Sequence, residues 1–193
     1  MAHRVCPWWL GYLLASPLRR LMMDPRKFLV PYVHEGMTVL EPGPGMGFFT
    51  LELAHLVGPS GRLIAVDIQP KMLSRLKRRA SRAGVLERID ARLATPDSMG
   101  LSDLAGAVDF TLAFAVVHEM PDAAEFFRQV AAASKPGSRL LFAEPAGHVS
   151  TWEFEAELDA AAKAGFVLLD RPAVRRSHTA LLTLSSYNTP QSP

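Results

Sequence analysis

Short apolar runs alternate with stretches of helical periodicity along most of the chain. Runs rich in β-branched and aliphatic residues, bounded by Gly, Pro or Asp, predict buried strands. Stretches in which apolar residues recur every three or four positions predict helices. The predicted strands are 38–40, 63–66, 89–94, 108–116 and 139–143. The predicted helices are 48–57, 72–83, 123–133 and one that is capped by Ser150 or Thr151 and runs to Ala164.

Two further predicted strands, 166–170 and 179–184, follow each other with no helical stretch between them. Alternation of strands and helices predicts an α/β fold with a parallel, doubly wound sheet and helices on both faces. A parallel return between the last two strands would need a crossover segment, which this part of the chain lacks. One edge strand is therefore expected to be antiparallel.

The 193 residues fit one domain at 36–185, preceded by a helical segment at 1–35 and followed by a flexible tail at 186–193. The apolar run 8–15 is too short to span a bilayer, and no signal-peptide pattern surrounds it. We expect it to form an amphipathic helix that covers the domain or its site. A helix lying on a membrane surface is the alternative.

Composition narrows the class of protein only slightly. The chain is 49% hydrophobic with a net charge of +2, which is typical of a globular domain and gives no reason to expect nucleic acid. The basic stretch 71–82 has the spacing of a solvated helix face. Cys6 is the single cysteine, so no internal disulfide is possible and a cytoplasmic location is expected. Cys6 itself is interpreted as a packed small hydrophobe.

A glycine-rich loop joins the first predicted strand to the helix that follows it. Gly43, Gly45 and Gly47 stand at alternate positions, and glycines let a backbone bend sharply and approach a ligand closely. The amide groups of the following helix suit a carboxylate or phosphate. Phe48 occupies the place where the dinucleotide fingerprint needs its third glycine, so the spacing argues against a nicotinamide cofactor.

Two carboxylates accompany this loop. Glu41 ends the strand just before the glycines, where it can hold an ammonium group, and Asp67 ends the next strand, where it can accept hydrogen bonds from ribose hydroxyls. The pair suits a ligand with an amino-acid end and a nucleoside end. Structural roles compete with these: Gly47 can allow close helix packing, and Asp67 can cap the helix that begins near Pro70.

On these motifs, residues 25–184 resemble the class I S-adenosylmethionine-dependent methyltransferases, and most closely the small proteins grouped with the ubiquinone/menaquinone-biosynthesis methyltransferases. The resemblance implies a Rossmann-like seven-stranded sheet, mostly parallel with an antiparallel last strand. It also implies S-adenosylmethionine as cofactor and S-adenosylhomocysteine as product. The residues it assigns to the cofactor are Glu41, Gly43, Gly45 and Gly47 around the methionine part, Asp67 at the ribose, Ile68 on the adenine, Asp97 at the adenine edge and Ala115 beside the methyl group. Pro96 departs from the family pattern, in which that position is often acidic.

The acceptor is expected beyond the carboxyl ends of the strands. His118 and Glu119 follow one predicted strand there, and Glu144 and His148 follow the next. Methyl transfer from a sulfonium is an in-line displacement, and a base is needed only if the acceptor must lose a proton. His118 is the candidate base, with Glu119 beside it as a second catalytic candidate.

Each of these residues also has a structural alternative. His118 can make a structural hydrogen bond, Glu119 can cap the helix after Pro121, and Glu144 and His148 can shape the pocket. Their spacing matches no recognised metal site, so no metal is expected.

The sequence also ranks acceptor classes and competing functions. It lacks the Asn/Asp-Pro-Pro-aromatic motif of amino-methylating nucleic-acid enzymes, and it lacks the several cysteines on which related arsenite methyltransferases rely. Three tryptophans and eight methionines favour a small, apolar or lipid-like acceptor. A cofactor-binding module without chemistry is the main alternative, and an NAD-dependent oxidoreductase a weaker one. The acceptor atom, the need for a base and the oligomeric state stay open.

Overall fold

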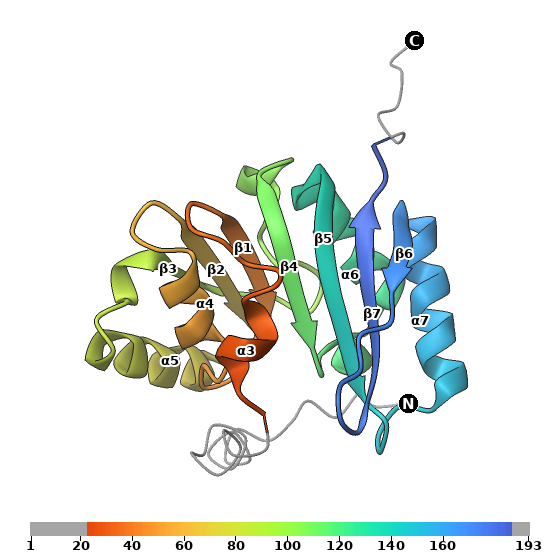
Figure 1. Ribbon diagram of the computed structural model, residues 1–193, viewed down its shortest axis with the longest axis horizontal. Coiled ribbons are helices and arrows are strands. Elements are labelled where there is room, and N and C mark those ends of the chain that lie inside the picture. The colour runs from red at the N-terminus through yellow and green to blue at the C-terminus, as the bar shows by residue number, and fades with distance from the viewer. Residues whose placement is uncertain (1–22, 187–193) are drawn as a thin grey trace. The chain divides into compact units, whose positions relative to one another are not determined.

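The computed structural model describes residues 23–186. The chain forms two compact units, residues 1–100 and 101–193. Its seven strands have the order β3-β2-β1-β4-β5-β7-β6, and they alternate with helices along the chain (Figure 1). The expected Rossmann-like α/β fold with a mostly parallel sheet and an antiparallel last strand is confirmed.

The first unit holds a parallel three-stranded part of the sheet. β1 pairs with β2 and β2 with β3, in both cases in parallel. Successive central residues of β1 and β2 are buried, and successive side chains point to opposite faces, so both faces of these strands are covered. The elements are α3 (Pro25–Leu29), β1 (Thr38–Pro42), α4 (Thr50–Leu56), β2 (Arg62–Asp67), α5 (Pro70–Arg82), η1 (Leu86–Arg88) and β3 (Ile89–Leu93).

The second unit is built around β5 and a cluster of phenylalanines. The ring of Phe127 lies 5.5 Å from that of Phe142 and 6.4 Å from that of Phe166, both in edge-to-face contact. β4 pairs with β5 in parallel, while β7 is antiparallel to both β5 and β6. The elements are η2 (Ser102–Leu104), β4 (Val108–Phe114), η3 (Val117–Glu119), α6 (Ala123–Ala133), β5 (Ser134–Pro145), α7 (Thr151–Lys163), β6 (Phe166–Asp170) and β7 (Ser177–Leu184).

The sequence predicts that the antiparallel strand lies at the edge of the sheet, but the structure places it one position inside the edge. β7 lies between β5 and β6, and β6 is the edge strand. The helix α7 joins β5 to β6 as a crossover, and β7 then returns between these two strands. A helix-less connection requires only that neighbouring strands be antiparallel, and it does not decide which of them is outermost.

Most predicted bounds differ from the structure by a few residues, and three of the differences have a visible structural context. α4 begins at Thr50 instead of 48, after a turn through Gly47. β5 begins at Ser134 instead of 139, and its register with β4 shifts between Val108 and Phe110. β4 ends at Phe114 instead of 116, because Ala115 has a positive φ of 56°. Helix α6 and strand β6 have the predicted bounds.

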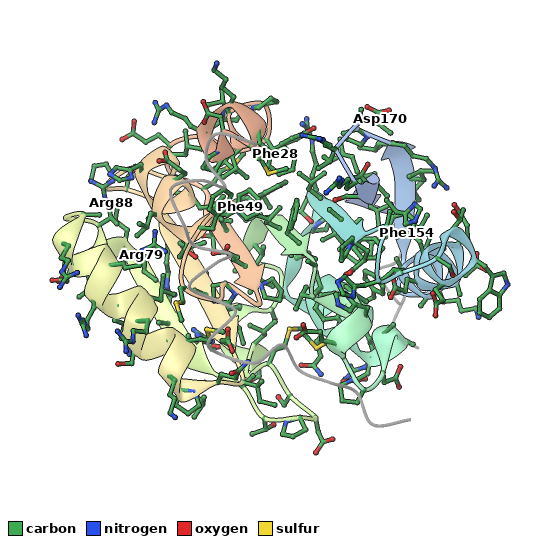
Figure 2. All side chains as sticks on the ribbon, turned by 90° about the horizontal axis from the view of Figure 1, so that it is seen from below. Phe28, Phe49, Arg79, Arg88, Phe154 and Asp170 are labelled. Atoms are coloured by element: carbon green, nitrogen blue, oxygen red, sulfur yellow. The ribbon has the colours of Figure 1, made fainter. Side chains whose placement is uncertain are left out.

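The predicted N-terminal helix at 8–15 and the end of the predicted tail lie outside the described residues. Within 23–35, α3 is a single short helix that begins at Pro25 and is capped by Asp24, whose Oδ1 accepts from the amide of Arg26 at 3.0 Å. Phe28 of α3 packs against Phe49, with ring centroids 5.7 Å apart (Figure 2). No helix between residues 23 and 186 has the length and apolar character needed to cross a membrane.

Candidate functional site

The loop after β1 has a backbone that requires glycine at each alternate position. Gly43, Gly45 and Gly47 have φ values of +66°, +54° and +84°, which side chains on L-residues rarely allow. The amide of Gly43 donates to the carbonyl of Val66 on β2 at 2.8 Å, which fixes the start of the loop. Arg79 of α5 donates to the carbonyl of Met46 and holds the loop from the other side (Figure 2).

Gly45 and Gly47 differ in what a side chain would meet. A Cβ at Gly45 would have no atom of residues 23–186 within 4 Å, whereas a Cβ at Gly47 would lie 2.5 Å from Cδ1 of Leu76 on α5. Gly47 therefore packs closely against α5, which is the structural role that competes with ligand binding at this position. Gly45 instead leaves open space beside the backbone, as a ligand-binding loop requires.

Glu41 on β1 is a buried carboxyl with an unsatisfied oxygen. The residue is 3% exposed, and its Oε2 has no hydrogen-bond partner among the described residues. Burial raises the pKa of Glu41 to about 8, the Thr50 hydroxyl opposes this rise, and the Asp67 carboxylate adds to it. The hydroxyl of Thr50 is also buried and has no hydrogen-bond partner among the described residues. A buried carboxyl oxygen such as that of Glu41 is costly to leave unpaired, and a cationic donor would satisfy it.

Asp67 is the last residue of β2 and Ile68 follows it, at the same end of the unit as the glycine loop. Oδ1 of Asp67 accepts a hydrogen bond from the amide of Gln69 at 2.8 Å, just before α5 begins. Asp67 thus has a structural bond in addition to the ribose contact predicted for it. The side chain of Ile68 is 40% exposed and has the surface that a purine could cover.

Asp97 lies in an exposed turn after β3. Thr95 and Ser98 close this turn, with the amide of Thr95 donating to the Ser98 carbonyl at 2.9 Å. The backbone of the same segment is tied to β2, since the amide of Ala94 donates to the carbonyl of Asp67 at 3.0 Å. The chain therefore brings the predicted ribose and adenine-edge residues to the ends of two paired strands.

In the second unit, β4 ends in a strained turn. Ala115 has a φ of +56° and donates its amide to the carbonyl of Ala143 on β5 at 2.7 Å. This left-handed conformation is uncommon for alanine and persists only where the surroundings enforce it. The turn directs the amides of Val116 and Val117 to Oε1 of Glu144, at 3.1 Å and 2.7 Å. Strained, over-determined turns of this kind cluster at functional sites.

Glu144 also holds His118. The carboxylate has no exposed surface, and its Oε2 contacts Nδ1 of the His118 imidazole. With Nδ1 donating to the carboxylate, Nε2 of a neutral imidazole is left as the proton acceptor. Hydrogen bonding to Glu144 is the main cause that raises the pKa of His118 above its ordinary value, and the charges of Glu144, Glu119 and Glu157 add to the rise, whereas burial lowers it. Glu144 is thus a partner of His118 and not only a pocket residue.

Two further residues belong to this cluster. The ring of His148 stacks near that of His118, with centroids 6.3 Å apart and planes 12° from parallel. Glu157 on α7 has a buried Oε2 with no hydrogen-bond partner in the described part of the chain, and burial is the main cause that raises its pKa to about 7. Glu157 was not among the residues predicted from the sequence. Its spacing from the buried Phe154 and Ala161 of α7, by three and four positions, was the available signal.

Comparisons with known proteins show which family the chain belongs to. The sequence profile of a family described as "Methyltransferase domain" matches residues 33–179. An arsenite methyltransferase of Halobacterium salinarum is 28% identical over 109 residues, which are 56% of this chain and 27% of that protein. A ubiquinone/menaquinone biosynthesis C-methyltransferase of Pasteurella multocida is 30% identical over 112 residues, 58% of this chain and 41% of that protein. The chain spans less than half the length of these curated relatives.

Solved structures show the same fold. A SAM-dependent methyltransferase from Aquifex aeolicus superposes with a TM-score of 0.83 at 23% identity, over 93% of this chain and all 100% of that one. The fold and the glycine loop therefore define a class I S-adenosylmethionine-dependent methyltransferase domain. The chain belongs to the methyltransferase-domain family whose profile covers residues 33–179, which confirms the family expected from the sequence.

The residues around the glycine loop fit the cofactor of this family. S-adenosylmethionine carries an ammonium group, which would supply the missing partner of Glu41 Oε2. The space beside Gly45 admits a ligand close to the backbone. Within residues 23–186, no group of three or more His, Cys, Asp or Glu side chains is arranged to hold a metal ion.

Proposed function

We propose that this protein transfers a methyl group from S-adenosylmethionine to a small organic acceptor, with His118 as the general base. The observation that carries the proposal is the contact between His118 and the buried Glu144, at the ends of β5 and of the turn after β4. A histidine whose Nδ1 is fixed by a carboxylate, and whose other nitrogen is available, has the arrangement of a general base.

The bound cofactor supplies a methyl group activated by a sulfonium. Glu41 and the loop of Gly43, Gly45 and Gly47 would bind its methionine part through the unsatisfied carboxyl oxygen and the open backbone. Asp67 would accept hydrogen bonds from the ribose hydroxyls. Ile68 and Asp97 would contact the face and the edge of the adenine, and Ala115 would lie beside the methyl group. These residues bind and orient, which is the main requirement of an in-line displacement.

The second unit supplies the proton chemistry. The bound cofactor would supply the methyl group, and Nε2 of His118 would take the proton that the acceptor loses. Glu144 keeps the imidazole in the required tautomer and stabilises the imidazolium, because it is buried and already bonded to two backbone amides. Glu119 lies in the same turn as His118, and its negative charge also favours the protonated imidazole of His118.

A small organic acceptor is favoured over the other classes considered. The matched relative of Pasteurella multocida is named a ubiquinone/menaquinone biosynthesis C-methyltransferase. The matched relative of Halobacterium salinarum is named an arsenite methyltransferase, but this chain has Cys6 as its single cysteine and lacks the thiol set that arsenic would need. We therefore propose an organic hydroxyl, thiol or activated carbon that must lose a proton.

Transfer of label from methyl-labelled S-adenosylmethionine to a panel of phenols, quinols and thiols would test the proposal. We expect labelled product with at least one of these classes, and a His118→Asn variant that binds cofactor without forming product. Binding of S-adenosylhomocysteine with no transfer to any acceptor in the panel would favour a cofactor-binding module instead. Binding of NAD with S-adenosylmethionine inert would contradict the proposed cofactor.

A further inference from the structure

Glu157 of α7 has one buried carboxyl oxygen, and the proposed reaction assigns this residue no role. Its Oε2 is enclosed and has no hydrogen-bond partner within residues 23–186, although the side chain as a whole is only partly buried. A buried, unpaired carboxyl oxygen costs free energy and is seldom retained where it does nothing. The surroundings of Glu157 show what it acts on.

The packing of α7 on β5 sets the position of Glu157. Phe154 of α7 stacks on Phe142 of β5, with ring centroids 4.8 Å apart and planes 17° from parallel; Figure 2 shows Phe154 at α7. Glu144 is two positions after Phe142, so both project from the same face of β5. Glu157 is three positions after Phe154, so both lie on one side of α7. The stacked phenylalanines therefore bring Glu157 toward Glu144.

The ionisable groups around this point come from three elements. His118 is influenced by Glu144 of β5, by Glu119 in its own turn and by Glu157 of α7, and the ring of His148 stacks near it. Glu157 is influenced by Glu144, by His118 and by Glu153 in its own helix. The charge of His118 favours the ionised form of Glu157, and the ionised form of Glu157 favours the charged form of His118.

We infer that Glu157 is a positioning residue that acts through His118, and that its carboxyl gives up a proton when the imidazole gains one. This inference rests on the proposed function only for its use in catalysis, because the coupling itself is a property of the folded protein. Oε1 of Glu144 accepts from two backbone amides and its Oε2 contacts His118, so this side chain is held in place beside the imidazole. The proton exchange is between His118 and Glu157.

The proton count balances in this scheme. Before transfer, neutral His118 and protonated Glu157 carry no net charge together. When Nε2 of His118 takes the proton of the acceptor, Glu157 releases its own proton to water, and the two groups again carry no net charge together. Keeping the net charge of a partly buried cluster constant avoids the cost of adding a charge there. One proton reaches solvent for each methyl group transferred, as methylation of a protonated acceptor requires.

NMR titration of the histidine rings in the full-length protein tests the coupling without any acceptor. In Glu157→Gln, we expect the titration midpoint of His118 to move to lower pH, because an anionic neighbour has been removed. The matched control is Glu155→Gln on the same helix, which removes an exposed carboxylate paired with Arg171 at 2.8 Å. This control should leave the His118 midpoint unchanged. A folded Glu157→Gln protein with the midpoint of the wild type would overturn the inference.

A reciprocal measurement covers the case in which Glu157→Gln fails to fold. Coupling between two sites acts equally in both directions, so His118→Asn should raise the midpoint of Glu157 in carboxyl NMR. An unchanged Glu157 midpoint in that variant would also overturn the inference. Both titrations are independent of turnover. A protein that shows the coupling but methylates no acceptor would therefore contradict the proposed function alone.

Discussion

Oε2 of Glu144 contacts Nδ1 of His118, and the Glu144 carboxylate that makes this contact has no exposed surface. Its other oxygen accepts from two consecutive backbone amides at 3.1 Å and 2.7 Å. A carboxylate fixed by three donors cannot follow the imidazole if the imidazole moves. Glu144 therefore defines one position and one tautomer for His118, and the protonation of the pair depends on both residues.

Replacement of His118 should affect turnover and not cofactor binding. We expect His118→Ala to lower kcat by about 10²-fold or more, since the variant lacks the proton acceptor, with nearly unchanged affinity for S-adenosylhomocysteine. His118→Asn can keep a hydrogen bond but cannot accept the proton. Steady-state kinetics and calorimetry measure the two effects. An Asn variant as active as the wild type would show that His118 only orients the acceptor.

Replacement of Glu144 by Gln should weaken the base while keeping the turn. The amide oxygen of Gln can still accept from Val116 and Val117, but the imidazolium loses its anionic partner, and the pKa of His118 falls. Activity requires neutral His118 and rises with pH, so its rising limb should move to lower pH and its plateau should drop. Glu144→Ala should also lose about 3 kcal/mol of stability, because two buried amides lose their acceptor. A pH profile identical to that of the wild type would contradict this role.

The pKa of His118 also predicts how stability depends on pH. The folded pKa lies above the ordinary value of 6.5, so its contribution to stability is complete below pH 6.5 and is lost as pH rises through the folded pKa. Urea unfolding between pH 5 and pH 9 measures this loss, which should be smaller in Glu144→Gln.

Glu41 should couple cofactor binding to proton release. The apo pKa of about 8 means that the folded protein binds more protons than the unfolded chain between pH 4.5 and about 8, so this group makes stability fall with rising pH in that window. A bound ammonium group favours the carboxylate and should expel its proton. We expect calorimetric enthalpies near pH 7 to depend on the ionisation enthalpy of the buffer, and Glu41→Gln to abolish this dependence. Equal buffer dependence in both proteins would exclude Glu41 as its source.

Asp67 should show two separable roles. Asp67→Asn retains an oxygen that can accept from the amide of Gln69, so the free energy of unfolding should change little. Asp67→Ala removes that bond as well and should cost about 1 kcal/mol of stability. Both variants should weaken cofactor binding, because the ribose hydroxyls lose a charged acceptor. If Asp67→Asn binds the cofactor as tightly as the wild type, Asp67 is a structural cap only.

Gly45→Ala and Gly47→Ala should separate ligand approach from packing. Both residues have a positive φ, so each substitution costs about 1–2 kcal/mol in backbone strain. Gly47→Ala adds the contact with Leu76 Cδ1 at 2.5 Å and should lower the melting temperature more. Gly45→Ala places a methyl group in open space and should mainly weaken cofactor binding. Equal loss of affinity in the two variants at matched stability would contradict the distinction.

The local parts of this molecule were determined by the sequence itself. The bounds of α6 follow from its 3.6-residue periodicity and from Asp122, whose side chain caps the first turn. The loop after β1 was predictable because a positive φ is a property of single residues, and three glycines at alternate positions indicate such a backbone. Glu41 and Asp67 were found because strand ends carry their own sequence signals.

Tertiary structure decided whatever depends on partners distant in sequence. The Glu144–His118 contact joins residues 26 positions apart, and no periodicity encodes which strand-end residues will meet. The place of β7 between β5 and β6 depends on how far from β5 the crossover through α7 positions β6. Glu157 was missed because a carboxyl at a helix position is usually solvated, and its spacing from Phe154 gains meaning only once Phe154 is seen to stack on Phe142. The physical reason is the same in these cases. How deeply a side chain is buried, and which charges act on it, depends on all the residues around it in space, and the order of residues along the chain does not show which these are.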